Sequence, residues 1–311
     1  MRRVLCREFA DPERFETVEE PTPVAGPGEV VVEVEAAAVS FVDGLIARGG
    51  YQLRPPLPFT PGTAVAGTTG GRRVAALLTS FGGFASHVRV PADALVPVPD
   101  GVGAGVAASS MESHGTMAFA LRDRVAVRPG EWVVVLGASG GIGQAAVDHA
   151  RAAGARVLAV ASTPDKRDAA LAAGAEAAIG YDGLKDAIRA HTGGGADVVV
   201  DPVGGDAAEA ALRALGTGGR FCVLGFTSGG IPRLPANIVL LRNRTVVGVD
   251  WGDWSRTDPA ASRDLAAQVL RRIAAGELHP AEPDALPLDD AAVATRAYAE
   301  RTAVGKLVLT P

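Results

Sequence analysis

The chain is poor in the residues that build disulfides and metal sites. Its 311 residues include two cysteines and five histidines. Cys6 and Cys222 each lie in an apolar run, which is typical of buried free thiols rather than of a disulfide. The first residues hold no apolar segment like that of a signal peptide, and no apolar run is long enough to span a bilayer. We therefore expect no membrane segment and a reducing, cytoplasmic setting.

Positive charge is also scarce. The formal net charge is −5 and the sequence pI is near 5.6, which argues against nucleic acid as the main partner. The small-molecule substrate that we expect instead follows from the family resemblance given below. Hydrophobic residues make up 48% of the chain and the mean hydropathy is +0.20, so the chain is globular rather than disordered. Its length is enough for two domains with a core that needs neither disulfides nor metal.

One stretch, Glu131–Gln144, carries the most information. The apolar run 132–136 predicts a buried strand, and a helix is expected to begin near Ile142. Between them the first glycine permits a tight turn, the middle pair lets the backbone approach phosphates, and the last lets the helix pack closely on the strand. The sequence therefore predicts a dinucleotide site. Its expected cofactor-binding residues are Gly137, Ala138, Ser139, Gly140, Gly141, Ile142 and Gly143.

The chain changes its pattern near residue 113. Before it, strands are expected at 30–39, 72–78 and 85–90, with a short helix at 40–48. After it, strands and helices alternate, which predicts a parallel sheet covered by helices on both faces. The strands are expected at 132–136, 156–161, 176–179, 197–201, 220–224 and 244–249, and the helices at 142–153, 164–173, 183–191 and 206–215.

The last part of the chain is expected to return to the first domain. A helix at 258–276 precedes a final strand at 306–310. The predicted organisation is an α/β chain with a discontinuous β-rich domain, 1–112 and 258–311, and a Rossmann domain of doubly wound parallel sheet, 113–257.

The second strand of the Rossmann unit indicates which dinucleotide is bound. An acid at the end of this strand would hold the ribose 2′-hydroxyl of NAD, but here the strand ends in alanine. Hydroxyls and bases follow, and they favour NADP(H): Ser162, Thr163, Lys166 and Arg167. The alternative is that Ser162 or Thr163 only caps the next helix and that the two bases are solvated.

Several motifs together resemble one family. They are Gly-Ala-Ser-Gly-Gly-Ile-Gly (137–143), Ala-Ser-Thr-Pro-Asp-Lys (161–166), Asp-Pro-Val-Gly-Gly-Asp (201–206), Gly-Gly-Arg-Phe-Cys-Val-Leu-Gly-Phe (218–226) and Gly-Lys-Leu-Val-Leu (305–309). The chain resembles the medium-chain dehydrogenase/reductase superfamily over nearly its whole length, and within it the zinc-free quinone oxidoreductase branch, also called ζ-crystallin-like. The resemblance implies a Rossmann domain and a β-rich GroES-like catalytic domain.

The resemblance also implies an activity: hydride transfer from NADPH to a quinone or to the β-carbon of an α,β-unsaturated carbonyl. It implies a homodimer, paired through the edge strand 244–249. Thr116 would lie near the nicotinamide, and Tyr181 near the adenosine 2′-phosphate. The remaining residues that it implies for the cofactor are Val203, Gly204, Gly225, Phe226, Thr227 and Lys306.

A zinc site is not expected. Zinc-dependent relatives hold catalytic zinc with a Cys, a Gly-His-Glu turn and a further Cys or Asp. Here Ser40 lies where the first Cys would be, and the matching turn reads Pro61-Gly62-Thr63. The two distant cysteines cannot supply the four closely spaced ones of a structural zinc lobe.

The chain departs from the family pattern at three places. Members commonly read Ala-Gly-Val-Asn-x-x-Asp after the first long strand; here Asp43 is kept, but Ser40 replaces the Asn. Glu112 and His114 enter a wall that is usually apolar and aromatic. The segment 67–73 is shorter than the β-hairpin of relatives. Together with Thr116, which the resemblance places near the nicotinamide, these positions give the candidate catalytic residues: Ser40, Asp43, His114 and Thr116.

The departures leave alternatives open. His114 could be a proton donor tuned by Glu112, provided that the two share a face, as they would on a strand but not on a helix. Otherwise Glu112 caps or is solvated, and His114 is a hydrogen-bonded wall residue. Trp251 and Trp254 either line the substrate site together with Glu112 or pack at a subunit or domain contact.

Three functions are compatible with these residues. The first is an NADPH-dependent reductase of quinones or enones. The second is a family member that has been turned to a specialised step, redox or non-redox, on a biosynthetic intermediate, which Ser40, Glu112 and His114 motivate. The third is an NADPH-binding protein without turnover.

Overall fold

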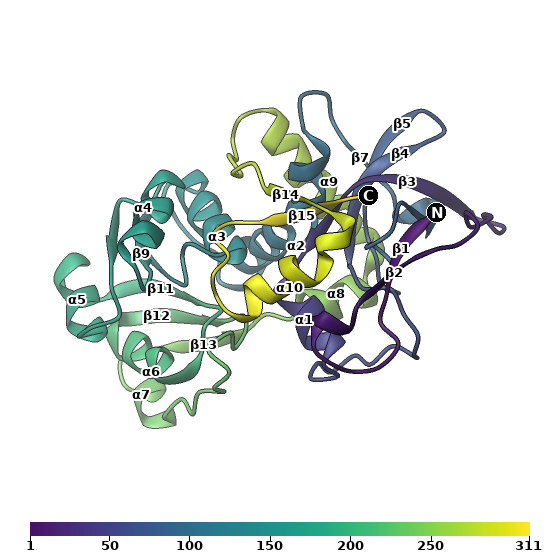
Figure 1. The fold of residues 1–311 in the computed structure, drawn as a ribbon. Helices are drawn as coiled ribbons and strands as arrows, with labels where there is room; N and C mark the ends of the chain where they lie inside the picture. The colour runs from purple at the N-terminus through teal and green to yellow at the C-terminus, as the bar shows by residue number, and fades with distance from the viewer. The chain divides into compact units, whose positions relative to one another are not determined.

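A computed structural model describes all residues, Met1–Pro311, and they form two compact units. Unit 1 consists of Met1–Gly115, Trp254–Gly276 and Ala281–Pro311, and unit 2 of Thr116–Asp253 and Glu277–Pro280. Each unit is described by itself below (Figure 1). The domain boundaries given from the sequence stay a prediction about which segments fold independently.

Unit 2 is built on a six-stranded parallel sheet with the order β10-β9-β8-β11-β12-β13. Numbered along the chain, this is the 3-2-1-4-5-6 order of a Rossmann fold. The predicted doubly wound sheet is therefore confirmed. The strands are β8 (Trp132–Leu136), β9 (Arg156–Val160), β10 (Ala177–Ile179), β11 (Ala196–Asp201), β12 (Leu215–Val223) and β13 (Thr245–Gly248).

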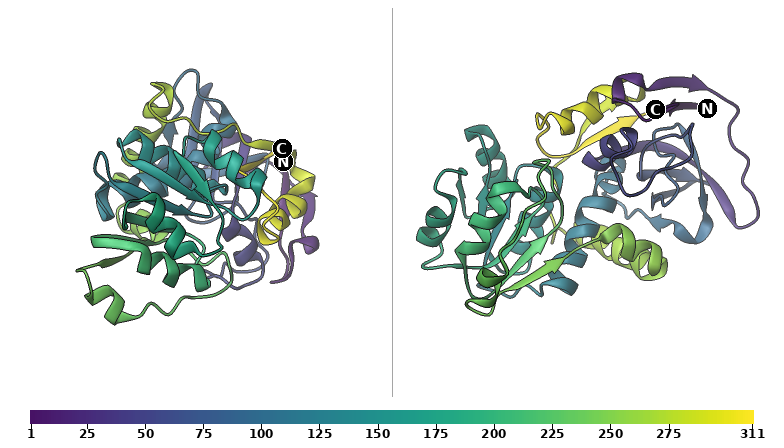
Figure 2. Two further views of the ribbon diagram at one scale, coloured as in Figure 1. Left: turned by 90° about the vertical axis from the view of Figure 1, so that its left-hand side faces the viewer. Right: turned by 90° about the horizontal axis from the view of Figure 1, so that it is seen from below.

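Helices cover both faces of this sheet (Figures 1 and 2). Alternate residues of the central strand β8 explain why, because Val133 and Val135 belong to the core on one face, and Val134 and Leu136 to the core on the other. α3 (Gly141–Ala152) and α4 (Pro164–Ala172) pack on the first face. α5 (Leu184–His191), α6 (Gly205–Ala214) and α7 (Ala236–Leu240) pack on the second.

Unit 1 is dominated by a sheet with the order β14-β15-β3-β4-β5-β7, in which β6 also pairs with β3. The final strand β15 runs antiparallel to β3, so the end of the chain joins this sheet. β1 (Arg2–Leu5) and β2 (Glu16–Glu19) form a separate pair. The strands of the larger sheet are β3 (Glu29–Val39), β4 (Ala64–Thr69), β5 (Arg72–Leu77), β6 (His87–Pro91), β7 (Val96–Pro97), β14 (Asp284–Pro287) and β15 (Leu307–Thr310).

The shortened segment after residue 67 is a tight hairpin between β4 and β5. Gly70 and Gly71 form its two-residue turn, with φ of +54° and +74°, and Thr69 pairs with Arg72. Two consecutive residues with positive φ are what a type I′ turn needs, so glycine suits both positions. The sequence analysis did not predict β4, although the Gly-Gly pair was a signal for it.

The remaining helices belong to unit 1 or cross from one unit into the other. α1 (Phe41–Ala47) and α9 (Pro259–Ala274) were expected, whereas α10 (Ala291–Ala299) was not. α2 (Ala104–Ala118) and α8 (Trp251–Thr257) cross between the units, and a π-helical segment, Phe119–Arg124, follows α2. Three 3₁₀ turns complete the chain: Pro12–Arg14, Ala92–Ala94 and Leu288–Asp290. No helix combines the length and apolar character that crossing a membrane requires.

The contact between β8 and α3 gives a stability prediction. A Cβ at Gly143 would lie 2.2 Å from the carbonyl oxygen of Gly137 and 2.6 Å from Cα of Ala138. Because both neighbours are backbone atoms, we expect Gly143→Ala to lower the free energy of unfolding by about 1–3 kcal/mol or more. Urea unfolding followed by tryptophan fluorescence measures this.

Gly180→Ala is the matched control in the same unit. A Cβ there would lie no closer than 3.7 Å to another atom, and its φ is not positive. Equal destabilisation by the two substitutions would show that the close approach of α3 to β8 is not the cause.

Candidate functional site

The glycine-rich turn of unit 2 has the backbone that a pyrophosphate needs. Gly137 adopts φ of +61°, and Gly140 is the N-cap of α3 with its N–H bonded to the Gly137 oxygen at 3.1 Å. The Tyr181 hydroxyl accepts the Gly137 N–H at 3.0 Å, so Tyr181 holds the turn from outside. Side chains are therefore kept out where the turn meets the helix N-terminus, and the residues fit a bound dinucleotide.

Two further loops lie beside this turn. A Cβ on Gly137 would lie 3.0 Å from Cγ2 of Val203, and the Ser228 N–H donates to the Val203 oxygen at 2.9 Å. Thr227 N–H donates to Pro202 oxygen at 3.1 Å. The structure thus gathers the predicted residues of three loops where β8, β11 and β12 end, and β8 and β11 flank the point at which the strand order reverses. Ligands of open α/β sheets bind at such a point.

Asp201 is a site residue that the sequence analysis missed. Its Oδ1 accepts the N–H groups of Val203 and Gly204, both at 2.8 Å, so it fixes the loop after β11. Burial raises the pKa of Asp201, and the two backbone hydrogen bonds oppose this. The Asp-Pro-Val-Gly-Gly motif was the available signal, because an Asp before a turn often binds the N–H groups that follow it.

The residues expected at the 2′-phosphate lie where β9 meets α4. Ser162 and Thr163 are exposed. Thr163 caps α4, since its Oγ1 accepts the Lys166 N–H at 3.3 Å. The Arg167 guanidinium donates to the Ala161 oxygen at 3.4 Å. The capping alternative thus describes Thr163, while binding of a phosphate by this group stays a prediction.

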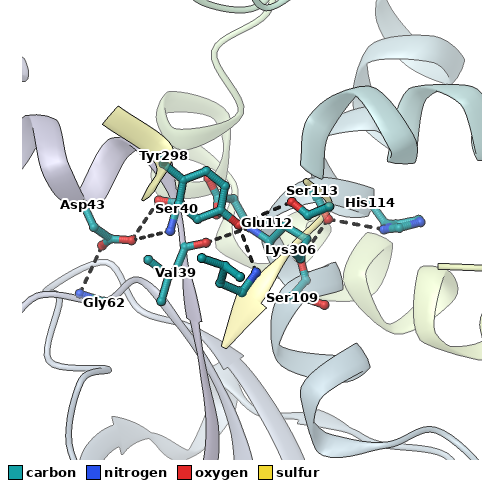
Figure 3. A network of polar contacts seen from close by, with 12 residues as sticks. Val39, Ser40, Asp43, Gly62, Ser109, Glu112, Ser113, His114, Tyr298 and Lys306 are labelled. Atoms are coloured by element: carbon teal, nitrogen blue, oxygen red, sulfur yellow. Dashed lines mark hydrogen bonds and ion pairs between the residues drawn. The ribbon is translucent and has the colours of Figure 1, made fainter. Parts of the chain in front are cut away.

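In unit 1, Ser40 and Asp43 form a buried pair at the start of α1. Oδ2 of Asp43 accepts the Ser40 N–H at 2.8 Å and the Ser40 hydroxyl at 2.9 Å, and Oδ1 accepts the Gly62 N–H at 3.1 Å (Figure 3). Burial, followed by the charge of Glu112, raises the pKa of Asp43 to about 6, although these hydrogen bonds act to lower it. A carboxyl with this pKa exchanges protons close to neutral pH.

Lys306 lies next to this pair. Its Nζ donates to the Val39 oxygen at 3.1 Å and lies 3.5 Å from Oε2 of Glu112 (Figure 3). Burial lowers the pKa of Lys306, but the nearby carboxyl groups, Glu112 first, outweigh this and raise it, so the side chain is an ammonium. Its predicted contact with the cofactor stays a prediction; within unit 1 its charge is turned to Glu112.

Glu112 and His114 lie on a helix, so they do not share a face. Residues two apart on α2 point to sides roughly 200° apart. Glu112 faces Lys306, whereas His114 points away and has its Nδ1 3.3 Å from the Ser113 hydroxyl (Figure 3). The condition under which Glu112 would tune His114 is not met.

The other candidates lie further along the chain. Thr116 is buried near the end of α2. Trp251 is buried at the start of α8, its ring centroid 6.0 Å from that of Phe119, which is aromatic packing. Trp254 is half-buried on the same helix. A substrate role for these residues stays a prediction. No group of three or more His, Cys, Asp or Glu side chains could hold a metal ion.

Comparisons with known proteins agree with this arrangement. A family model described as zinc-binding dehydrogenase matches residues 141–268. The quinone oxidoreductase-like protein 2 of Bos taurus is 36% identical over 325 residues, which are 99% of this chain and 92% of that protein.

Solved structures give the same result. The quinone oxidoreductase from Thermus thermophilus, also solved in complex with NADPH, shares 36% identity with a TM-score of 0.91, and the match covers 100% of both chains. The Escherichia coli quinone oxidoreductase complexed with NADPH shares 27% identity with a TM-score of 0.88, again over 100% of both chains. The expected fold and enzyme class are confirmed. The chain is therefore an oxidoreductase of the medium-chain dehydrogenase/reductase superfamily and belongs to its quinone oxidoreductase branch.

Proposed function

We propose that the protein is an NADPH-dependent reductase that passes hydride to a quinone or to the β-carbon of an α,β-unsaturated carbonyl without zinc. The observation that carries the proposal is the glycine turn with its two neighbouring loops, in a chain whose solved relatives include quinone oxidoreductases complexed with NADPH. When bound, NADPH supplies the hydride, so the protein has to bind, orient and manage protons.

The residues that would hold NADPH come from unit 2. The backbone of Gly137–Gly143 would bind the pyrophosphate, because the first N–H groups of α3 have no partner within the helix and can donate to phosphate oxygens. Ser162, Lys166 and Arg167 would take the 2′-phosphate, since hydroxyl and cationic donors follow β9 where an acid would select NAD. The residues of the loops after β11 and β12 would face the nicotinamide ribose.

The donor set supports a reaction without zinc. Ser40 stands where a cysteine ligand would be, and its hydroxyl is bonded to Asp43. In the matching turn the Gly62 N–H is bonded to the same carboxylate, and Thr63 follows in place of histidine. Hard hydroxyl oxygens are poor substitutes for the thiolate and imidazole ligands that zinc prefers.

Two further parts of the proposal concern the setting of the protein. The outer edge of β13 ends the sheet of unit 2, and an unprotected edge invites pairing, so we propose a homodimer joined there. Val246 on this strand and Leu240 and Leu241 before it are exposed.

Both cysteines are buried free thiols, which supports a reducing, cytoplasmic setting.

The first prediction concerns the cofactor. We expect tighter binding of NADPH than of NADH, and we expect Lys166→Ala to weaken NADPH binding about tenfold, because one charge-assisted contact to the 2′-phosphate is lost. NADH binding should not change. Fluorescence titration of both cofactors measures this. Lys185→Ala, which removes an exposed lysine of α5 paired with Asp186, is the control and should bind both like the wild type.

The second prediction concerns the reaction. We expect NADPH to be consumed with at least one acceptor from a panel of quinones and enones, followed by absorbance at the nicotinamide band. The departures at Ser40, Glu112 and His114 favour the other candidate, a specialised step that can be redox or non-redox. Measurable NADPH binding without consumption by any acceptor would reject the reductase and leave that candidate or a non-catalytic binding protein.

The third prediction concerns assembly. Light scattering at micromolar concentration should give twice the chain mass of 31.6 kDa. Val246→Lys should give the monomer, because a lysine on an edge strand opposes pairing. Val293→Lys, at an exposed position of α10 in unit 1, should remain a dimer. A monomeric wild type would refute the proposed dimer.

A further inference from the structure

Five polar side chains from four segments of the chain come together inside unit 1 (Figure 3). Two carboxyl groups and one ammonium group are present, so the charges do not balance if both carboxyls are ionised. The residues are Ser40, Asp43, Glu112, Tyr298 and Lys306. Like charges that share a buried region cannot all be held at low cost, and a proton taken up by one carboxyl relieves the excess.

The contacts of Lys306 decide which carboxyl keeps its charge. The ammonium lies 3.5 Å from Glu112 and donates to the Val39 oxygen at 3.1 Å, and the two side chains are only 12% and 19% exposed. Lys306 therefore neutralises Glu112 directly. Asp43 has hydrogen-bond donors around it, two backbone N–H groups and the Ser40 hydroxyl, but no ion pair. Asp43 is therefore the carboxyl whose protonation relieves the excess negative charge.

The charged and titratable groups near Asp43 come from each segment packed around it. Glu112 lies on α2, Lys306 precedes β15, and Tyr298 lies on α10. The Tyr298 hydroxyl accepts the Leu307 N–H at 3.0 Å, and burial raises its pKa, so it stays neutral. Arg48 after α1 is turned outward to Asp11, and Arg296 of α10 to Glu13.

We propose that Glu112, held by Lys306, is a positioning residue that favours the protonated form of Asp43, and that Ser40 delivers this proton to the reduced acceptor. The proposal rests on the proposed function. An acceptor that has gained a hydride carries a negative charge on oxygen. The Ser40 O–H bond breaks as its proton joins that oxygen, Ser40 Oγ takes the proton of the Asp43 carboxyl, and Asp43 is left as a carboxylate that regains a proton from water.

The helix cap alone does not account for this arrangement. A capping role explains why Asp43 accepts the Ser40 N–H at the start of α1. It gives no reason for the Glu112–Lys306 pair, which buries two charges and is expensive unless it serves another purpose. The Ser40 hydroxyl lies 2.9 Å from the same oxygen, as a capping box places it, and this distance also serves proton transfer in either direction.

The test reads the titration of Asp43 directly, in protein without cofactor or substrate. With carbon-13 in the aspartate carboxyls, we expect an Asp43 transition near pH 6. Glu112→Gln should move it about one pH unit lower, because a like charge is removed, and Lys306→Met should move it higher, because a cation is lost. Glu20→Gln, which breaks a half-buried ion pair with Arg3 elsewhere in unit 1, should leave it unchanged.

Kinetics with an acceptor that the protein reduces complete the test. The acid form of Asp43 is the donor, so kcat should be full below its pKa and should fall as pH rises through it. The fall should move to lower pH in Glu112→Gln and to higher pH in Lys306→Met. Ser40→Ala should lower kcat at least tenfold, and Ser40→Thr, which keeps the hydroxyl, should restore most of it.

The outcomes separate this inference from the proposed function. An acceptor that is reduced, together with an Asp43 titration that neither Glu112→Gln nor Lys306→Met moves, overturns the inference and leaves the reductase standing. The variants could instead move the titration of Asp43 and leave the pH profile of kcat unchanged. That result overturns the proton delivery. If no acceptor is reduced, the reductase fails, and the proton delivery fails with it. A loss of stability alone would move neither the titration of Asp43 nor the pH profile of kcat. If Glu112→Gln does not fold, the result with Lys306→Met decides whether the inference stands.

Discussion

One buried ammonium group connects the first and the last of the segments that make up unit 1. Lys306 stands directly before the last strand, and its Nζ reaches the end of β3 at Val39 and the side chain of Glu112 on α2. β15 then pairs with β3 from Leu307 onward. The end of the chain thereby completes the sheet that its beginning started. Ser40 follows Val39 directly and Asp43 lies three residues later, so the position of Lys306 also bears on the candidate catalytic residues.

The free-energy cost of burying the Glu112–Lys306 pair indicates what the pair is for. Removing two charges from water costs several kcal/mol per ion, and the contact of Lys306 with Glu112 at 3.5 Å has to offset this cost. A well-packed apolar pair of similar size would be as stable or more so. Glu112, in place of an apolar side chain, is therefore not expected to stabilise the fold. Its electrostatic effect on Asp43 is the consequence that an apolar residue could not produce.

Local signals predicted unit 2 well. The strand–turn–helix pattern and the glycines located β8 and α3 to within one residue, because the backbone at Gly137 and Gly143 tolerates no other side chain. α2 was missed because its composition hides its helical period. Ser109 and Ser113 bond to carbonyls one turn earlier, so hydroxyls occupy buried positions that a polar-outside pattern assigns to the surface.

The residues of the candidate site also differ in how well the sequence predicted them. Cofactor residues lie in contiguous motifs, whereas the contact between Glu112 and Lys306 joins residues from distant parts of the chain, and no local pattern announces it. The sequence did identify Ser40 and Glu112 as departures from the family pattern. It left His114 as a possible partner of Glu112, because the secondary structure of that segment was not predicted. On a helix the carboxylate turns to Lys306 instead.

The two departures gain a common reason once they are placed together. An asparagine amide, which members commonly carry where Ser40 stands, can hold an oxygen but cannot exchange its protons with a carboxyl at neutral pH. A serine hydroxyl donates and accepts through one atom, so it can pass a proton on. That ability is useful only beside a carboxyl that exchanges protons near neutral pH, and burial together with Glu112 raises the pKa of Asp43 to about 6. The hydroxyl at 40 and the carboxylate at 112 therefore make chemical sense as a pair, although neither touches the other.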